Sequence, residues 1–167
     1  MVTSSRQSVV TAPAAYCAIV HGLQMAEAFP VVNLDTDARE AVELLASRRL
    51  PGLIVVDEKG RPHSVLPASQ VVRFLVPSYV QDDPSLARVI DESLADQVAD
   101  KLAGVTVRRL LPSKPVELPV VNHDDTVLEV AAIMARLRSP LVAVMKDKEI
   151  VGAITASRLL ELVIAPH

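Results

Sequence analysis

The stretch Pro30-Val31-Val32-Asn33 occurs a second time as Pro119-Val120-Val121-Asn122, 89 residues further along the chain. The same offset gives ten identities across the 27 positions from 30 to 56. After one residue is dropped between the following strands, Ala68-Ser69 aligns with Ala156-Ser157, so the register persists to the end of both copies. Internal similarity at a fixed offset indicates a duplicated structural unit.

Each copy has the pattern of a strand, a helix, two strands and a final helix. Apolar residues recur at helical spacing after each quoted stretch, and Asp35-Thr36 and Asp124-Asp125 are the candidate N-caps of these helices. Pro51 and Pro140 follow and lead into continuous apolar runs, as expected of strands that are covered on both faces. The predicted strands are 29–32, 53–56 and 62–66 in the first copy and 118–121, 141–145 and 150–154 in the second. The predicted final helices are 68–75 and 156–164.

These elements predict an α/β (α+β) fold in which two β-α-β-β-α repeats pack sheet to sheet with pseudo-two-fold symmetry, joined by a helical linker. A single unit of about 50 residues is too small to bury its own sheet, whereas two units packed together bury both. The predicted organisation is a flexible tail over 1–12, a first repeat over 13–76, an acidic helical linker over 77–105 and a second repeat over 106–167.

The linker differs from the repeats in its charge. Between positions 76 and 104 it carries six acidic residues against Arg88 and Lys101. Asp83-Pro84 is a suitable helix start and Gly104 a suitable stop, and apolar residues form a stripe between them. We therefore expect an amphipathic connecting helix with a solvated acidic face, and no metal site, because the pattern lacks converging ligands.

Composition and charge exclude several classes of protein. The chain has 167 residues, 50% of them hydrophobic, which excludes disorder of the whole chain. The longest uncharged stretch, 7–26, contains too many polar residues for a membrane span, and His21 and Gln24 argue against a secretory signal. One cysteine, Cys17, fits a reducing compartment, so we expect a cytoplasmic protein without membrane insertion. A net charge of −3 without a basic run argues against nucleic-acid binding.

No catalytic constellation is evident. The four histidines are scattered, and no Gly-rich phosphate loop of the form GxGxxG or GxxxxGK[ST] occurs. We therefore predict a protein that is not an enzyme, with no catalytic residues and no metal ligands.

The order of the duplicated elements, the hairpin 57–60 (Asp-Glu-Lys-Gly) and the run 152–155 (Gly-Ala-Ile-Thr) before the last helix resemble a tandem pair of CBS (cystathionine-β-synthase) domains over about residues 16 to 164. The resemblance implies a regulatory module that binds AMP, ATP or a related adenosyl ligand in clefts between the repeats and needs no cofactor. It also implies dimerisation through helices and control of a separate transporter, channel or enzyme.

The ligand motif of that family is Gly, two apolar residues, Thr or Ser, two residues, then Asp. Gly152 and Thr155 match it, but Arg158 occupies the Asp position, and the first copy has Ser64, Pro67 and Gln70 at these positions. A hydroxyl that caps a helix start favours phosphate binding there, and an arginine beside it favours an anion. Thr155 is equally an ordinary N-cap. In that family the Asp accepts from the ribose hydroxyls. Because it is missing from both copies, the alternative is a ligand-free interaction module that has lost nucleotide binding.

Further candidates lie at the strand starts and the helix ends. Four apolar residues are either walls for a base or part of the core: Val120, Val121, Leu141 and Val142. Arg138, repeated as Arg49, either lines a cleft for an anionic ligand or is a cation favoured at a helix C-terminus. The final helix is apolar on more than one face, which predicts a homodimer that uses it and the helices of the first repeat.

Overall fold

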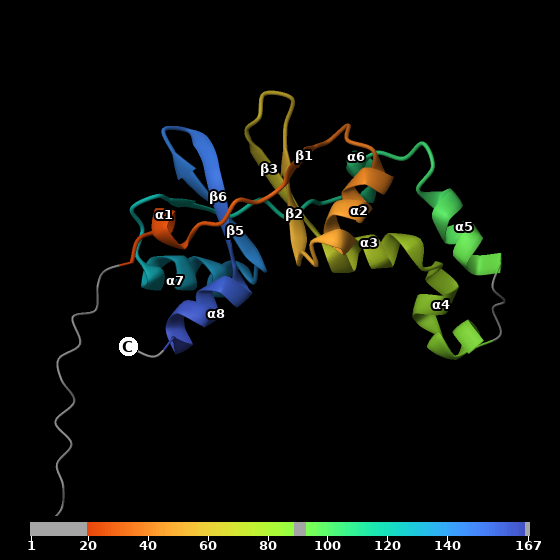
Figure 1. The fold of residues 1–167 in the computed structure, drawn as a ribbon. Helices are drawn as coiled ribbons and strands as arrows, with labels where there is room; N and C mark the ends of the chain where they lie inside the picture. The colour runs from red at the N-terminus through yellow and green to blue at the C-terminus, as the bar shows by residue number, and fades with distance from the viewer. Residues whose placement is uncertain (1–19, 89–92, 166–167) are drawn as a thin grey trace, which may run out of the picture.

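A computed structural model describes residues 20–88 and 93–165, so the predicted tail over 1–12 and Cys17 lie outside the described residues. The chain forms two three-stranded sheets, each with one parallel and one antiparallel pair (Figure 1). The strands of the first sheet, in order, are β1 (Val31–Asn33), β2 (Gly52–Val56) and β3 (Pro62–Pro67). Those of the second sheet are β4 (Val120–Asn122), β5 (Leu141–Lys146) and β6 (Glu149–Thr155).

Two helices accompany each sheet. They are α2 (Ala38–Ser47) and α3 (Ala68–Leu75) in the first repeat, and α7 (Val127–Leu137) and α8 (Ala156–Ile164) in the second. The bounds of α3 and α8 are those predicted from the sequence. Both sheets therefore carry the predicted strand, helix, strand, strand, helix order.

The N-caps of α2 and α7 differ from the prediction. Asp37 caps α2, because its carboxylate accepts from the N–H groups of Arg39 at 2.8 Å and Glu40 at 3.4 Å. Thr126 caps α7 in a capping box with Glu129. The Thr126 N–H that donates to Glu129 holds the pKa of that carboxyl below its usual value.

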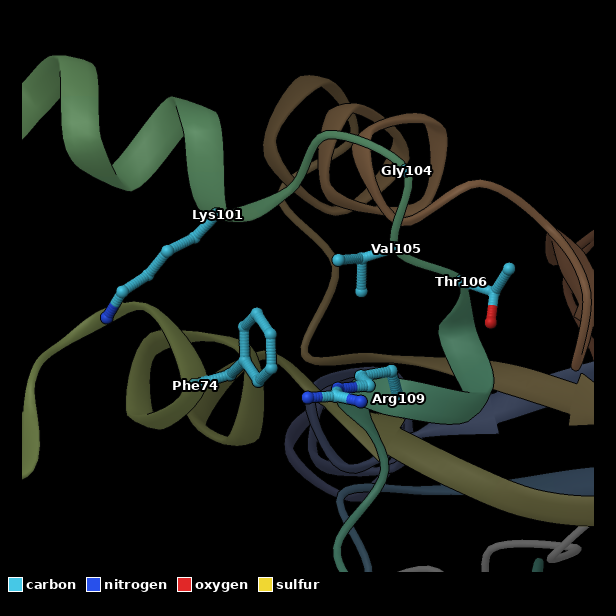
Figure 2. A pocket seen from close by; sticks show the side chains of 6 residues that line it. All are labelled: Phe74, Lys101, Gly104, Val105, Thr106 and Arg109. Atoms are coloured by element: carbon cyan, nitrogen blue, oxygen red, sulfur yellow. The ribbon is translucent and has the colours of Figure 1, made fainter.

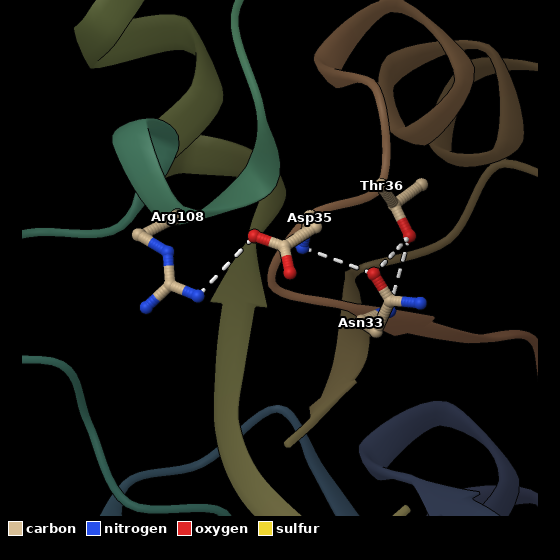
Figure 3. A network of polar contacts seen from close by, with 4 residues as sticks. All are labelled: Asn33, Asp35, Thr36 and Arg108. Atoms are coloured by element: carbon tan, nitrogen blue, oxygen red, sulfur yellow. Dashed lines mark hydrogen bonds and ion pairs between the residues drawn. The ribbon is translucent and has the colours of Figure 1, made fainter. Parts of the chain in front are cut away.

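The residues predicted as caps, Asp35-Thr36 and Asp124-Asp125, lie in the turns before the two helices. In the first of these turns, Asn33 Oδ1 accepts from the Asp35 N–H at 2.9 Å and from the Thr36 hydroxyl at 3.2 Å (Figure 3). The Asp35 carboxylate pairs with Arg108 Nη2 at 3.2 Å. These partners hold both side chains in the turn, so the cap falls to the next residue.

The short helix α1 (Gly22–Met25) precedes the first repeat in the chain but packs on the second (Figure 1). The N–H of Gly22 donates to the carbonyl oxygen of Asp125 at 2.8 Å, and the N–H of Leu23 donates to that of His123 at 2.9 Å. Helix α1 therefore packs on the second repeat, although it precedes the first repeat in the sequence.

Helix α6 (Val107–Leu110), which follows the linker, makes the matching contact with the first repeat. The N–H of Val107 donates to the carbonyl oxygen of Thr36 at 2.9 Å, and the N–H of Arg108 donates to that of Leu34 at 2.9 Å. These acceptors and those of α1 are related by the offset of the sequence repeat. Each repeat is therefore covered by the short helix α1 or α6 at equivalent positions, and this arrangement follows the pseudo-two-fold symmetry.

We call residues 20–28 and 105–117 the lead-in segments. Each also pairs with the outer strand of the repeat that it covers. Glu27 and Ala153 exchange backbone hydrogen bonds of 2.9 and 3.0 Å, and the N–H of Val65 donates to the carbonyl oxygen of Val116 at 3.2 Å. These contacts cover part of the otherwise free edges of β6 and β3. The repeats predicted over 13–76 and 106–167 follow the sequence. In the structure, each lead-in segment packs on the other repeat.

The core has three parts. Each sheet buries one face against its own helices and against the last residue of a lead-in helix, Met25 in the second repeat and Leu110 in the first. A third cluster joins the two sheets and consists of Ile54, Val56, Val65, Leu118, Leu141, Ala143 and Ala153. The predicted packing of sheet against sheet is therefore confirmed, as is the burial of every residue of β2.

The linker is less regular than predicted. It contains α4 (Ser78–Asp82), a 3₁₀ helix η1 (Pro84–Arg88) and α5 (Ser93–Lys101), and residues 89–92 lie outside the described residues. A helix does start at Asp83-Pro84 as predicted, but it is the 3₁₀ helix η1 and not the start of an α-helix. Asp83 instead accepts from the N–H of Ser85 at 3.0 Å and from its hydroxyl at 2.6 Å, which holds a tight local turn. Gly104 follows α5 with a φ of +67°, as expected of the residue that stops a helix.

Within the described parts of the chain, none of the helices is long and apolar enough to cross a membrane.

Candidate functional site

The ligand motif of the second repeat lies where β6 ends and α8 begins. Thr155 is the N-cap of α8, and its Oγ1 accepts from the N–H of Arg158 at 3.2 Å. The capping role of Thr155 is therefore confirmed. The hydroxyl keeps its proton for a further acceptor, because a threonine hydroxyl both donates and accepts.

Arg158 lies between two glutamates. Its Nε is 3.8 Å from Glu27 Oε1, and its Nη1 donates to Glu161 Oε2 at 3.3 Å. The Nε atom is buried and has no hydrogen-bond partner among the described residues. A buried donor without an acceptor costs about 1–3 kcal/mol, and an anion can accept from this covered Nε only after the Arg158 side chain has moved. Arg158 thus places a positive charge at this corner, beside the carboxylates of Glu27 and Glu161.

Gly152 has a role that differs from the one expected. It lies within β6 rather than at a turn, and it is buried because the first lead-in segment crosses it. A Cβ at this position would lie 2.7 Å from the carbonyl oxygen of Glu27 and 3.1 Å from the Cβ of Ala26. The absence of a side chain lets the lead-in segment approach closely enough to bring Glu27 beside Arg158.

The four apolar candidates do not form one wall. Val121 and Val142 are buried in the helix-side core of the second repeat, and Leu141 is buried between the sheets. Val120 is 46% exposed. Three of the four are therefore core residues, and Val120 alone offers an accessible apolar surface.

Arg138 ends α7 as its C-cap, in the left-handed conformation with a φ of 49°. Arg49, its counterpart, has a φ of 51° and follows Arg48, the C-cap of α2. Within the described residues, Arg138 makes no side-chain hydrogen bond or ion pair with Gly152, Thr155 or Arg158. Its position matches the interpretation as a cation at a helix C-terminus.

In the first repeat, Gln70 stands at the position of Arg158, so the three motif positions there carry no cation. Ser64 is fully buried, and Gln70 donates from Nε2 to the carbonyl oxygen of Leu110 at 3.3 Å. Val116 makes the backbone contact that Glu27 makes in the second repeat. The two strand-to-helix junctions therefore share this backbone contact but differ in the charge of their side chains.

Sequence reasoning missed Glu27, because that residue precedes the repeated stretch and reaches Arg158 only through the exchange. Its alignment with Val116 at the repeat offset was the available signal. Across residues 20–88 and 93–165, no group of three or more His, Cys, Asp or Glu side chains is placed to hold a metal ion.

Comparison with protein-family models finds one match, the CBS domain, over residues 20–77 and 97–165. No curated protein matches the chain by sequence. Among solved structures, a CBS domain-containing protein of unknown function from Kribbella flavida is 90% identical, with a TM-score of 0.79, and the match covers 87% of this chain and 99% of that chain.

More distant structures share the fold. The CBS domain of a CBS domain-containing membrane protein from Sphaerobacter thermophilus is 19% identical, with a TM-score of 0.65, and the match covers 89% of this chain and 90% of that one. CBSX2, a CBS-pair protein from Arabidopsis thaliana, has been solved in complex with AMP. That complex is 17% identical, with a TM-score of 0.59, and the match covers 86% of this chain and 96% of that one.

Proposed function

Because the chain belongs to the CBS domain family, we propose that it is a non-enzymatic regulatory module that senses an adenine nucleotide or a related anionic ligand between its repeats. It acts on a separate transporter, channel or enzyme in the cytoplasm. The observation that carries this proposal is the Arg158 guanidinium beside the Thr155 cap: within the described part of the chain, the guanidinium Nε has no hydrogen bond and only a long ion pair with Glu27. The AMP bound to CBSX2 supports an adenosine phosphate as the class of ligand.

A phosphate at this corner accepts from the Arg158 guanidinium and from the N-terminal turn of α8, where the helix dipole favours negative charge. Glu27 is the competitor for that guanidinium. Its ion pair with Arg158 is long, at 3.8 Å, and the two side chains are 54% and 32% exposed, so little free energy opposes its replacement.

A ligand phosphate that replaces Glu27 at the Arg158 guanidinium changes the contacts between the repeats. Glu27 belongs to the lead-in segment that joins the first repeat to the second, so a ligand that takes over Arg158 releases one of the contacts between them. A ligand shifts the arrangement of two repeats only through its difference in affinity for the two states. The competition between Glu27 and phosphate provides such a difference.

Calorimetric titration tests the sensing proposal. We expect heat with AMP or ATP among a set that also includes S-adenosylmethionine and cyclic dinucleotides. Arg158→Gln weakens that binding about tenfold or more, because it removes charge-assisted hydrogen bonds. Arg136→Gln, an exposed arginine of α7, serves as the matched control and binds as the parent does.

Two results contradict sensing at this corner. One is no heat with any of these ligands at millimolar concentration, and the other is equal affinity in Arg158→Gln and the parent. The first of these results leaves the second candidate function, a ligand-free interaction module, whereas the second places nucleotide binding elsewhere on the protein. The ligand-free module is favoured by Gln70, whose side chain is already bonded to the Leu110 carbonyl where the family motif has a carboxylate.

We also propose a homodimer that uses α8 together with the helices of the first repeat. Leu160, Val163 and Ile164 of α8 are 60%, 59% and 76% exposed. Neighbouring apolar residues exposed to this degree are typical of an interface. Sedimentation at micromolar concentration should give about twice the chain mass of 18.0 kDa, and Ile164→Glu should shift the population to monomer. Leu86→Glu, at an exposed linker position, is the control. A single 18.0 kDa species for the parent protein rules the dimer out.

A further inference from the structure

A cavity of about 480 Å³ lies between α3, the C-terminal end of α5 and the start of the second lead-in segment (Figure 2). Six residues line it: Phe74, Lys101, Gly104, Val105, Thr106 and Arg109. Two of them are cations, one is aromatic and none is acidic. The volume falls in the range of small-molecule sites, roughly 300–1,000 Å³.

The two cations have donors to spare. Lys101 Nζ donates to the carbonyl oxygen of Leu75 at 3.1 Å, which uses one of the three donors of an ammonium group. Arg109 makes no side-chain hydrogen bond or ion pair with a described residue, and its guanidinium lies beside the Phe74 ring in Figure 2. Arg108, the preceding residue, is instead committed to Asp35 at 3.2 Å. Of two successive arginines, one stabilises the fold and the other faces the cavity.

The second repeat shows that the fold does not need the Arg109 cation. By the correspondence of α1 with α6, Gln24 stands where the first repeat has Arg109. By the correspondence of α8 with α3, Leu162 stands where it has Phe74. The same backbone is therefore built without the cation, which leaves Arg109 available for a ligand. Phe74 packs against the core of the first repeat, as Leu162 does in the second, but it also lines the cavity with an aromatic ring.

We propose that this cavity binds a phosphate monoester that carries a planar ring. The phosphate lies against Arg109 and Lys101, because a guanidinium fork and an ammonium group both match phosphate oxygens. The ring packs against Phe74, as aromatic faces do with planar groups. Lys101 and Gly104 belong to the linker, whereas Phe74 belongs to α3, so the bound molecule ties the linker to the first repeat.

The probe for this site is 1-naphthyl phosphate, read by fluorescence anisotropy. The chain has no Trp, so the naphthyl emission is free of tryptophan background. We expect the parent protein to bind the probe, Arg109→Gln to weaken binding about tenfold or more, and Phe74→Leu to weaken it severalfold. Arg108→Gln, one residue away on the same helix, is the matched control and keeps the affinity of the parent.

Circular dichroism first confirms that each variant is folded, and Lys101→Gln replaces Arg109→Gln if the latter does not fold. No binding by the parent at millimolar probe, or equal affinity in Arg109→Gln and Arg108→Gln, overturns the proposal. Arg158→Gln should bind the probe at this cavity as the parent does. Failure of this site and failure of the Arg158 corner are therefore distinguishable.

Discussion

Met25→Ala is expected to lower the free energy of unfolding by about 2–5 kcal/mol, because it truncates a fully buried side chain and leaves a cavity. Met25 stands before the first repeat in the chain but packs in the core of the second, with Val121 and Val142. Urea denaturation followed by circular dichroism measures the loss. Hydrogen exchange locates it, and we expect faster exchange in α7 and β5 rather than in β1, the next strand along the chain.

Leu23→Ala is the matched control, since Leu23 lies in the same short helix and is 46% exposed. Its truncation should change the stability by less than about 0.5 kcal/mol. Equal effects of the two substitutions, or faster exchange confined to the first sheet, would show that α1 is not anchored in the second repeat.

Leu141→Ala is expected to cost about 2–5 kcal/mol as well, for a different reason. Leu141 is fully buried in the cluster between the two sheets. Its loss weakens the contact of repeat with repeat, so both sheets should unfold in one transition at lower urea. A double-mutant cycle with Ile54→Ala, from the first sheet, should give a coupling energy of about 0.5–3 kcal/mol, because both side chains share this cluster.

Leu137→Ala, at a position that is 45% exposed, is the control for that experiment. The comparison also decides between the two interpretations of Leu141. A core residue loses stability when truncated, whereas a wall for a base would lose nucleotide affinity and leave the stability nearly unchanged. The burial of Leu141 favours the first result.

The repeat made much of the fold predictable. Its period placed both sets of strands, and α3 and α8 begin and end where the pattern of apolar residues predicts. Thr155 was predictable as a cap because a capping hydroxyl acts on the residues directly after it. Predictions of this kind succeed because their physical cause lies within one turn of the chain.

The predictions that were wrong or missing concern residues whose positions depend on contacts far along the chain. Three adjacent residues, Asp35, Thr36 and Asp37, are all capable of capping α2, and the choice depends on Asn33 and Arg108, which hold the first two in the turn. Helix α1 is too short to carry a periodic signal.

The ion pair of Glu27 with Arg158 was harder to predict, because the alignment of Glu27 with Val116 does not show that Glu27 reaches the start of α8 through the docking of α1 on the second repeat. The part of the candidate site that lies at the start of α8, Thr155 and Arg158, was therefore predictable from the sequence. The part supplied by the lead-in segment was not.

The exchange of lead-in segments also sets the order of events during synthesis. The side chain of His21 is bonded to the carbonyl oxygen of Asp124, 103 residues later in the chain. Residues 20–28 thus leave the ribosome long before their partners in β6. Closing a loop of this length is slow compared with local folding. A nascent chain that holds only the first repeat therefore exposes Met25 and lacks the α6 cover of its own core, and it stays open to chaperones until the second repeat has been made.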